Sequence, residues 1–210
     1  MTPKKDLELY LHIPFCRQKC RYCDFLSAPL ATDSSTADGY VPKRYVDALL
    51  SQIVQESQFY QERRVTTIFW GGGTPSLLRV MDMERLMDAI RTHFCVADDA
   101  EITLESNPGT LDFEKLVGYR RAGINRLSMG MQSACDKELA MLGRIHNFDT
   151  FVQNYKQARR AGFENIKDKI KAPDVYLKLK KEKLSDKLPV EELQKRLSEL
   201  QEFLKQPKCE

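Results

Sequence analysis

The sequence predicts an α/β fold with parallel strands, and two observations point to it. Short β-rich runs alternate along the chain with segments in which apolar residues recur at helical spacing. Each strand–helix unit occupies roughly thirty residues, a length that suits parallel strands joined by right-handed crossover helices. The strands are expected at Glu8–Ile13, Thr66–Trp70, Glu101–Ser106 and Arg126–Gly130. Both an open sheet and a curved barrel fit this pattern.

Helices are expected between and after these strands. In the first helix Val46, Leu49 and Ile53 repeat every three or four positions and would form one apolar stripe. The four helices are expected at Arg44–Phe59, Asp82–Phe94, Asp112–Ala122 and Phe148–Ala161. Gly123 and Gly162 follow the last two of them, where glycine commonly ends a helix.

Composition narrows the class of protein. The 210 residues suffice for one ordinary domain with a sizeable core. No stretch of eighteen apolar residues occurs, so no transmembrane segment is expected. The first residues lack the apolar core of a signal peptide, which argues against export and for a cytoplasmic location. A net charge of +3 is too small to indicate a nucleic-acid partner.

The composition changes near residue 166 and divides the chain into two predicted parts. Residues 1–165 hold 14 Arg, 7 Lys and 21 acidic residues, whereas residues 166–210 hold 11 Lys, 1 Arg and 9 acidic residues. In the lysine-rich part, Pro189 precedes an amphipathic helical pattern made by Val190, Leu193, Leu197, Leu200 and Leu204. We expect a core over 1–166 and an atypical tail of different origin over 167–210. A surface helix that packs on the core is the alternative.

Three of the six cysteines lie within eight residues of one another. The close group is Cys16, Cys20 and Cys23, and the scattered ones are Cys95, Cys135 and Cys209. A disulfide framework normally shows distributed pairs in a secreted chain. The close group therefore indicates metal or cluster binding.

Three neighbouring thiolates suit a [4Fe-4S] cluster that keeps one iron open. Cysteine is the usual ligand of such clusters, and Cys95 follows Cys23 only after 72 residues. The loop comes directly after a predicted strand, and active sites form where parallel strands end. A zinc site with His12 or a distant residue as the fourth ligand is the alternative, but the second CxxC-like half of a structural zinc site is missing. His12 is expected instead to face inward or toward the loop.

The residues around the cysteines resemble a known family. Leu9–Cys16 reads LYLHIPFC and Cys20–Phe25 reads CRYCDF, as in the oxygen-independent coproporphyrinogen III oxidase-like group of radical S-adenosylmethionine (SAM) proteins. The pattern is most similar to the HemW-type haem-chaperone branch, in which the cysteine motif also lies near the N-terminus. The resemblance implies a partial radical SAM (β/α) barrel with a [4Fe-4S] cluster on Cys16, Cys20 and Cys23.

Further motifs match the family in the same order. Phe69–Ser76 reads FWGGGTPS, Leu104–Thr110 reads LESNPGT, and Asn125–Ser133 is followed by LGRIH at Leu142–His146. The glycine run is not the GxGxxG fingerprint, so nicotinamide or flavin binding is unsupported. Taken singly, these residues would be read as loop, strand-end or core positions. The resemblance implies SAM contacts from Tyr10, Tyr22, Gly72, Gly73, Thr74, Glu105, Gln132 and Arg144, and it assigns no catalytic residue.

The resemblance ends near residue 166. The family continues into a fifth strand that supplies an aspartate, which spacing places at position 169, where this chain has Lys169 beside Asp168. A one-residue slip in a strand turns a side chain to the opposite face. We therefore expect a truncated or rearranged chain of about four strand–helix units, with an exposed sheet edge and weakened but not abolished SAM binding.

Three functions stay open on this resemblance. The first is a haem chaperone that binds haem and passes it to an acceptor protein. The second is an oxygen-independent coproporphyrinogen III oxidase, an enzyme of porphyrin biosynthesis that decarboxylates porphyrinogen propionates. The third is an inactive remnant or a zinc protein. The first two imply haem or porphyrinogen as ligand, and an electron donor such as flavodoxin or ferredoxin.

Overall fold

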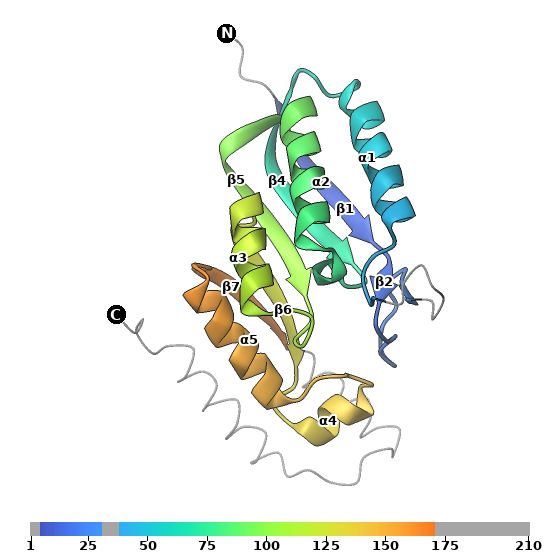
Figure 1. Ribbon diagram of the computed structural model, residues 1–210, viewed down its shortest axis with the longest axis vertical. Helices are drawn as coiled ribbons and strands as arrows, with labels where there is room; N and C mark the ends of the chain where they lie inside the picture. The colour runs from blue at the N-terminus through green and yellow to red at the C-terminus, as the bar shows by residue number, and fades with distance from the viewer. Residues whose placement is uncertain (1–4, 31–37, 171–210) are drawn as a thin grey trace.

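A computed structural model describes residues 5–30 and 38–170, which contain a five-stranded parallel sheet (Figure 1). The strands are β1 (Lys5–Ile13), β4 (Arg63–Gly72), β5 (Cys95–Ser106), β6 (Arg126–Gln132) and β7 (Asn165–Ile170). They stand in the order β1-β4-β5-β6-β7, and every neighbouring pair is parallel. The carboxyl ends of all five strands therefore meet at one edge, as the sequence predicts for the first four of them.

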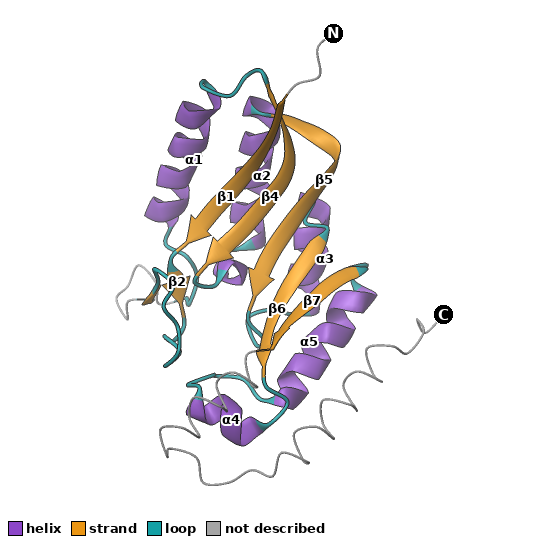
Figure 2. Cartoon of the chain, turned by 180° about the vertical axis from the view of Figure 1, so that it is seen from behind, coloured by secondary structure: helices purple, strands orange, loops and turns teal. Residues whose placement is uncertain are grey.

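Four helices cover one face of this sheet. They are α1 (Lys43–Ser57), α2 (Val80–His93), α3 (Phe113–Ala122) and α5 (Phe148–Arg160). Figure 2 shows the opposite face, which no described element covers. Two shorter helices, η1 (Pro75–Leu77) and α4 (Asp136–Met141), follow β4 and β6 at the carboxyl edge.

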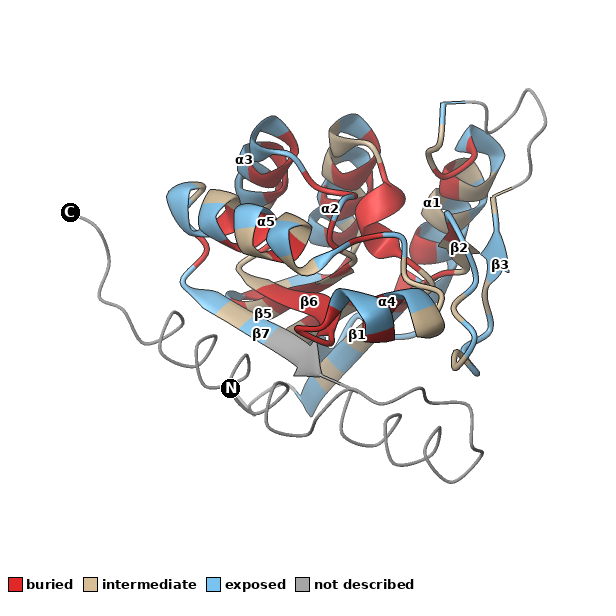
Figure 3. Cartoon of the chain, turned by 90° about the horizontal axis from the view of Figure 1, so that it is seen from below, coloured by how far each residue is buried: buried red, intermediate tan, exposed pale blue. Residues whose placement is uncertain are grey.

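The core lies between the sheet and the helices (Figure 3). Ile13, Trp70, Leu104 and Leu127, one from each of the first four strands, are fully buried in one apolar cluster that includes residues of α2, α3 and α5. Because side chains alternate along a strand, the intervening positions point to the open face. Tyr10 on that face keeps 59% of its surface exposed.

The ends of α3 follow from local sequence. Asp112 accepts a hydrogen bond from the backbone N–H of Lys115 and so caps the first turn. Gly123 ends the helix with φ +104°, a left-handed conformation that favours glycine. Gly162 adopts φ +88° just after α5. The predicted role of both glycines is confirmed.

The structure contains further elements besides the predicted ones. Each predicted strand and helix is present, with ends shifted by a few residues. The helix α4 was not expected, and β7 crosses the predicted boundary at residue 166. The predicted tail helix lies outside the described residues. Among the helices that are described, none has the length and apolar character needed to cross a membrane.

The close packing of α3 against α2 predicts that Gly118→Ala destabilises the protein. In an open helix, alanine is favoured over glycine by about 1 kcal/mol. At Gly118, however, a Cβ would lie 2.4 Å from a methyl group of Val80. We expect Gly118→Ala to lower the free energy of unfolding by about 1–3 kcal/mol, measured by urea denaturation.

Truncating the neighbour provides the control for this substitution. Val80→Ala removes the methyl groups that a new Cβ would meet. The double variant Gly118→Ala/Val80→Ala should therefore be more stable than Gly118→Ala alone. A stabilising effect of Gly118→Ala in the unchanged background would contradict the packing described here.

Candidate cluster and cofactor site

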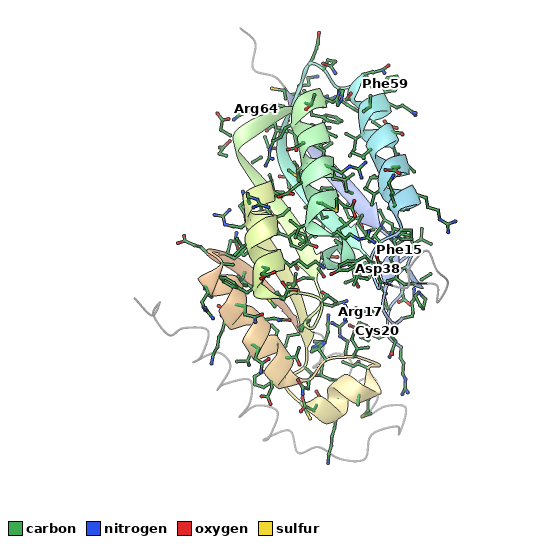
Figure 4. The ribbon with its side chains drawn as sticks, viewed as in Figure 1. Phe15, Arg17, Cys20, Asp38, Phe59 and Arg64 are labelled. Atoms are coloured by element: carbon green, nitrogen blue, oxygen red, sulfur yellow. The ribbon has the colours of Figure 1, made fainter. Side chains whose placement is uncertain are left out.

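The three clustered cysteines lie on a loop that leaves β1 at the carboxyl edge of the sheet. Two short parallel strands, β2 (Phe15–Cys16) and β3 (Ala28–Pro29), close the base of this loop. Cys16 is buried at the base, Cys20 and Cys23 are half-buried further along, and all three are free thiols. Figure 4 labels Phe15, Arg17 and Cys20 in this region of the molecule, beside the carboxyl ends of the strands.

Hydrogen bonds to a distant segment hold the cysteine loop. The Gln18 side chain donates to the carbonyl of Gly143 at 3.0 Å. The backbone N–H of Arg21 donates to the carbonyl of Leu142 at 3.1 Å. The loop is therefore fixed to the segment that follows α4, more than one hundred residues away in sequence.

The glycine run at the end of β4 packs directly against the cysteine loop. A Cβ on Gly73 would stand 2.6 Å from the carbonyl oxygen of Phe15 and 3.0 Å from the sulfur of Cys16. A Cβ on Gly72 would meet the His12 ring at 2.7 Å, and its φ of +108° also favours glycine. The sequence predicts that these glycines admit a ligand. In the structure Gly73 makes room for the cysteine loop and Gly72 makes room for the His12 ring on β1, and the contact of both glycines with a ligand stays a prediction.

Two side chains approach the cysteine sulfurs as hydrogen-bond donors. Thr74 Oγ1 lies 3.5 Å from Cys16 Sγ, and Arg144 Nη1 lies 3.4 Å from Cys20 Sγ. Asn107 joins these donors, because its Oδ1 accepts from Arg144 Nη2 at 2.7 Å and its Nδ2 donates to Thr74 Oγ1 at 2.8 Å. One polar chain therefore runs from the first cysteine to the second.

Gln132 occupies a strained position at the end of β6. Its φ is +67°, the only positive value outside glycine among the described residues. The side chain is buried, and its Oε1 has no hydrogen-bond partner within the described part of the chain. A Cβ on Gly130 would lie 3.1 Å from Gln132 Nε2 and 3.2 Å from Arg144 Nη2, so both groups meet there. Backbone strain and unpaired buried polar atoms are typical of functional sites.

The other predicted SAM contacts lie in two places. The Tyr22 hydroxyl accepts from Arg144 at 3.4 Å, and burial raises the pKa of Tyr22 to about 12 although Arg144 opposes the rise. Tyr10 and Glu105 are on the open face of the sheet, on β1 and β5. Burial, and secondarily the charge of Glu105, raises the pKa of Tyr10, so the two lie within electrostatic reach of each other.

Both histidines near the site serve the packing of loops. The ring of His12 contacts the carbonyl of Leu26 at 2.8 Å and the hydroxyl of Tyr10 at 3.0 Å, which confirms that it faces the loop. His146 is buried, with Nε2 3.2 Å from the carbonyl of Met131. Burial, followed by the charge of Arg144, lowers the pKa of His146 to about 4. His146 is therefore neutral at physiological pH.

The structure gathers most of the predicted site residues at one place and adds a further residue. The residues gathered at the cysteine loop are Tyr22, Gly72, Gly73, Thr74, Gln132 and Arg144. Tyr10 and Glu105 are a separate pair on the open face. Asn107 belongs to the LESNPGT motif, but the resemblance assigns it no role. Its position directly after the strand that carries Glu105 was the available signal.

The donor set fits an iron–sulfur cluster and an amino-acid ligand. Cysteine thiolates hold such clusters, and hydrogen bonds to their sulfurs tune the reduction potential. In the residues described, no three His, Cys, Asp or Glu side chains converge as they would on a single ion. The thiolates of a four-iron cluster bind separate irons and need no such convergence. The unpaired oxygen of Gln132 and the cation of Arg144 suit an amine and a carboxylate.

These features define a class of protein, and the chain belongs to the radical SAM superfamily. The sequence model of the radical SAM superfamily matches residues 10–174 of the chain. Its members use a [4Fe-4S] cluster and SAM. Within the class, the chain is similar to haem chaperone HemW of Escherichia coli strain K12, with 47% identity over 147 residues, and to haem chaperone HemW of Synechocystis, with 42% identity over 156 residues.

A solved structure extends the comparison. The fold matches coproporphyrinogen III oxidase (HemN) from Escherichia coli, described as a radical SAM enzyme, with a TM-score of 0.70 and 31% identity. This match covers 79% of the present chain and 37% of HemN. The two HemW alignments cover 70% and 74% of the chain and 37% of each relative. The chain therefore spans little more than a third of the length of these relatives.

The buried His146 predicts a dependence of stability on pH. Its pKa of about 4 lies below the ordinary value of 6.5, so the unfolded state binds more protons between these two pH values. Stability should fall as pH decreases from 6.5 to 4, by about 3 kcal/mol from this group alone. His146→Gln keeps an N–H for Met131 but removes the titration.

The comparison of the two proteins isolates the contribution of His146. Carboxylates titrate in both, so the difference between their unfolding free energies, measured by urea denaturation from pH 4 to pH 7, reports on the histidine. We expect the variant to lose less stability on acidification. Parallel curves for wild type and His146→Gln would contradict this prediction.

Proposed function

We propose that this chain is the cluster- and SAM-binding part of a HemW-like haem chaperone. The observation that carries the proposal is the pair of hydrogen-bond donors aimed at the sulfurs of Cys16 and Cys20. A loop that served packing alone would not need a threonine and an arginine directed at free thiols. The HemW identities of 47% and 42%, against 31% for HemN, favour the chaperone over the oxidase.

Each predicted residue has a role in this proposal. Cys16, Cys20 and Cys23 hold the cluster and leave one iron for SAM. Gln132 and Arg144 orient the amine and the carboxylate of the methionine part. The list of proposed SAM contacts is completed by Tyr10, Tyr22, Gly72, Gly73, Thr74 and Glu105. Tyr10 and Glu105 act from the open face of the sheet, where the rest of the ligand would lie.

The cofactors supply the chemistry, and the chain supplies its geometry. When bound, the cluster provides an electron for the reductive cleavage of SAM. The described residues position the ligand loop, and the buried neutral His146 keeps a charge away from Arg144. Haem or porphyrinogen, an electron donor such as flavodoxin or ferredoxin, and a haem-acceptor protein are the partners we propose, in a cytoplasmic setting.

The iron content of the purified protein tests the cluster. After anaerobic reconstitution we expect about four irons and four sulfides per chain in the wild type, and a loss of most of this iron in Cys20→Ala. Cys95→Ala is the matched control, because Cys95 is a free, exposed cysteine on β5. One zinc per chain, or equal iron losses in both variants, would overturn the proposal.

The affinity for SAM tests the ligand site. In isothermal titration of SAM into reconstituted protein, Gln132→Ala should weaken binding about tenfold to a hundredfold, because a hydrogen bond to a charged group is lost. Gln153→Ala, on the exposed side of α5, should leave the affinity unchanged. Equal affinities for all three proteins would contradict the assignment of Gln132.

Turnover of coproporphyrinogen distinguishes a HemN-like oxidase from a HemW-like chaperone. A HemN-like oxidase would consume coproporphyrinogen under anaerobic conditions with SAM and a reductant. A HemW-like chaperone would bind haem without this turnover. Release of carbon dioxide from coproporphyrinogen would therefore favour the oxidase.

A further inference from the structure

Asn107 stands at the centre of the polar chain that joins two of the cysteines. Its side chain lies between Arg144 and Thr74, at 2.7 Å and 2.8 Å. Arg144 continues to Cys20 and Thr74 continues to Cys16. No other described side chain bonds to both of these donors.

The direction of every bond in this chain follows from the chemistry of the arginine. A guanidinium only donates, so the atom of Asn107 that faces Arg144 is the amide oxygen. The amide nitrogen therefore faces Thr74 and donates to its hydroxyl oxygen. The hydroxyl hydrogen of Thr74 is then left to point toward the sulfur of Cys16. Asn107 thus directs the threonine as well as holding the arginine.

The backbone around Asn107 is held as firmly as its side chain. The carbonyl of Asn107 accepts from both the backbone N–H and the hydroxyl of Thr110, at 3.1 Å and 2.6 Å. The hydroxyl of Thr110 also meets that of Ser76 at 2.6 Å, in the turn that follows Thr74. Gly130 leaves room for the amide, because a Cβ there would lie 2.9 Å from its oxygen. These contacts therefore restrict the side-chain amide of Asn107 to a single orientation.

Hydrogen bonds to a thiolate ligand have a known effect on an iron–sulfur cluster. They stabilise the more negative, reduced state, so their loss lowers the reduction potential. The two donors here come from different parts of the chain, the turn after β4 and the segment after α4. A single residue that fixes both would tune two ligands together.

We propose that Asn107 is a positioning residue that holds Thr74 and Arg144 over the sulfurs of Cys16 and Cys20 and thereby raises the reduction potential of the cluster. The second half of this inference rests on the proposed function, since it needs the cluster. The first half concerns the protein alone. Two measurements therefore test the inference, one with the cluster and one without it.

The variants follow from the shape of the site. Asn107→Leu has nearly the same size and removes both hydrogen bonds. Asn107→Ser is smaller, cannot span the two partners, and serves if the leucine variant fails to fold. Asn125→Leu is the matched control, because Asn125 also uses both ends of its amide, bonding to Ile102 and Ala100. It lies directly before β6, at the amino-terminal edge of the parallel strands and away from the cysteine loop.

The first measurement is a redox titration of the reconstituted protein, followed by electron paramagnetic resonance. We expect the Asn107 variants to make reduction about tenfold less favourable, a downward shift of about 59 mV for one electron. Thr74→Val should shift the potential in the same direction by less, and Thr74→Ser should restore it. Asn125→Leu should leave it unchanged. A potential that does not move in the Asn107 variants overturns the proposed tuning, even if SAM binds more weakly.

The second measurement is a double-mutant cycle on the cluster-free protein. Asn107→Leu is combined with Thr74→Val and, separately, with Arg144→Met, and unfolding in urea is recorded. Each substitution changes the unfolding equilibrium constant by some factor. For residues in one network, the factor measured for the double variant should differ about fivefold from the product of the two single factors. Asn125→Leu combined with Thr74→Val should be additive. Additive effects at Asn107 would overturn its positioning role.

The two measurements separate the failure of this inference from that of the proposed function. If the wild type takes up no four-iron cluster, the proposed function fails and so does the tuning of a cluster. The cycle on the cluster-free protein still decides whether Asn107 holds the two donors. If the cluster forms and neither the potential nor the cycle responds to Asn107, the inference is wrong while the proposed function stands.

Discussion

The site depends on the close packing of the cysteine loop against the end of β4. Cys16 can approach this strand only because Gly73 has no side chain, since a Cβ would stand 3.0 Å from its sulfur. This contact brings Cys16 within reach of Thr74, the next residue along the chain. Fixing that end of the loop also fixes where Cys20 meets Arg144. A missing methyl group at one position therefore sets the geometry of both cysteine–donor pairs.

A buried lysine supports the same turn from the helix side. Lys115 donates to the carbonyl of Ser76 at 2.5 Å and to that of Thr110 at 3.3 Å. Burial lowers its pKa to about 8, and the charge of Asp112 opposes this only in part, because no carboxylate of the described residues forms an ion pair with Lys115. Rings of Tyr40 and Tyr119 lie 4.9 Å and 5.7 Å from its ammonium group and partly compensate. Burying this charge therefore lowers the stability of the fold, while its hydrogen bonds hold the turn after Thr74.

The main strands and helices and the three cysteine ligands could be predicted from the sequence. The contacts between residues far apart in the chain could not. Periodicity locates the first four strands of the sheet and the four longer helices because burial imposes it, and spacing alone isolates Cys16, Cys20 and Cys23. The role of Asn107 could not be deduced in this way, since it arises from bonds to residues 33 and 37 positions away. The same holds for α4, a helix of six residues that is too short to show a period. Long-range pairing, which a linear pattern does not encode, accounts for these omissions.

The polar side chains on the open face of the sheet are hydrogen-bonded to one another, whereas some of those at its carboxyl edge are not. On the open face, Arg126 donates to Glu101 at 2.9 Å and to Thr103 at 3.2 Å, so this cluster is complete without a ligand. At the carboxyl edge, Gln132 Oε1 and Arg144 Nε are buried and have no hydrogen-bond partner among the described residues. Leaving a buried polar atom unpaired costs about 1–3 kcal/mol, and a ligand that pairs it recovers this energy. The edge is therefore less stable than the face beside it, and binding at the edge would stabilise the fold as well as assemble the site.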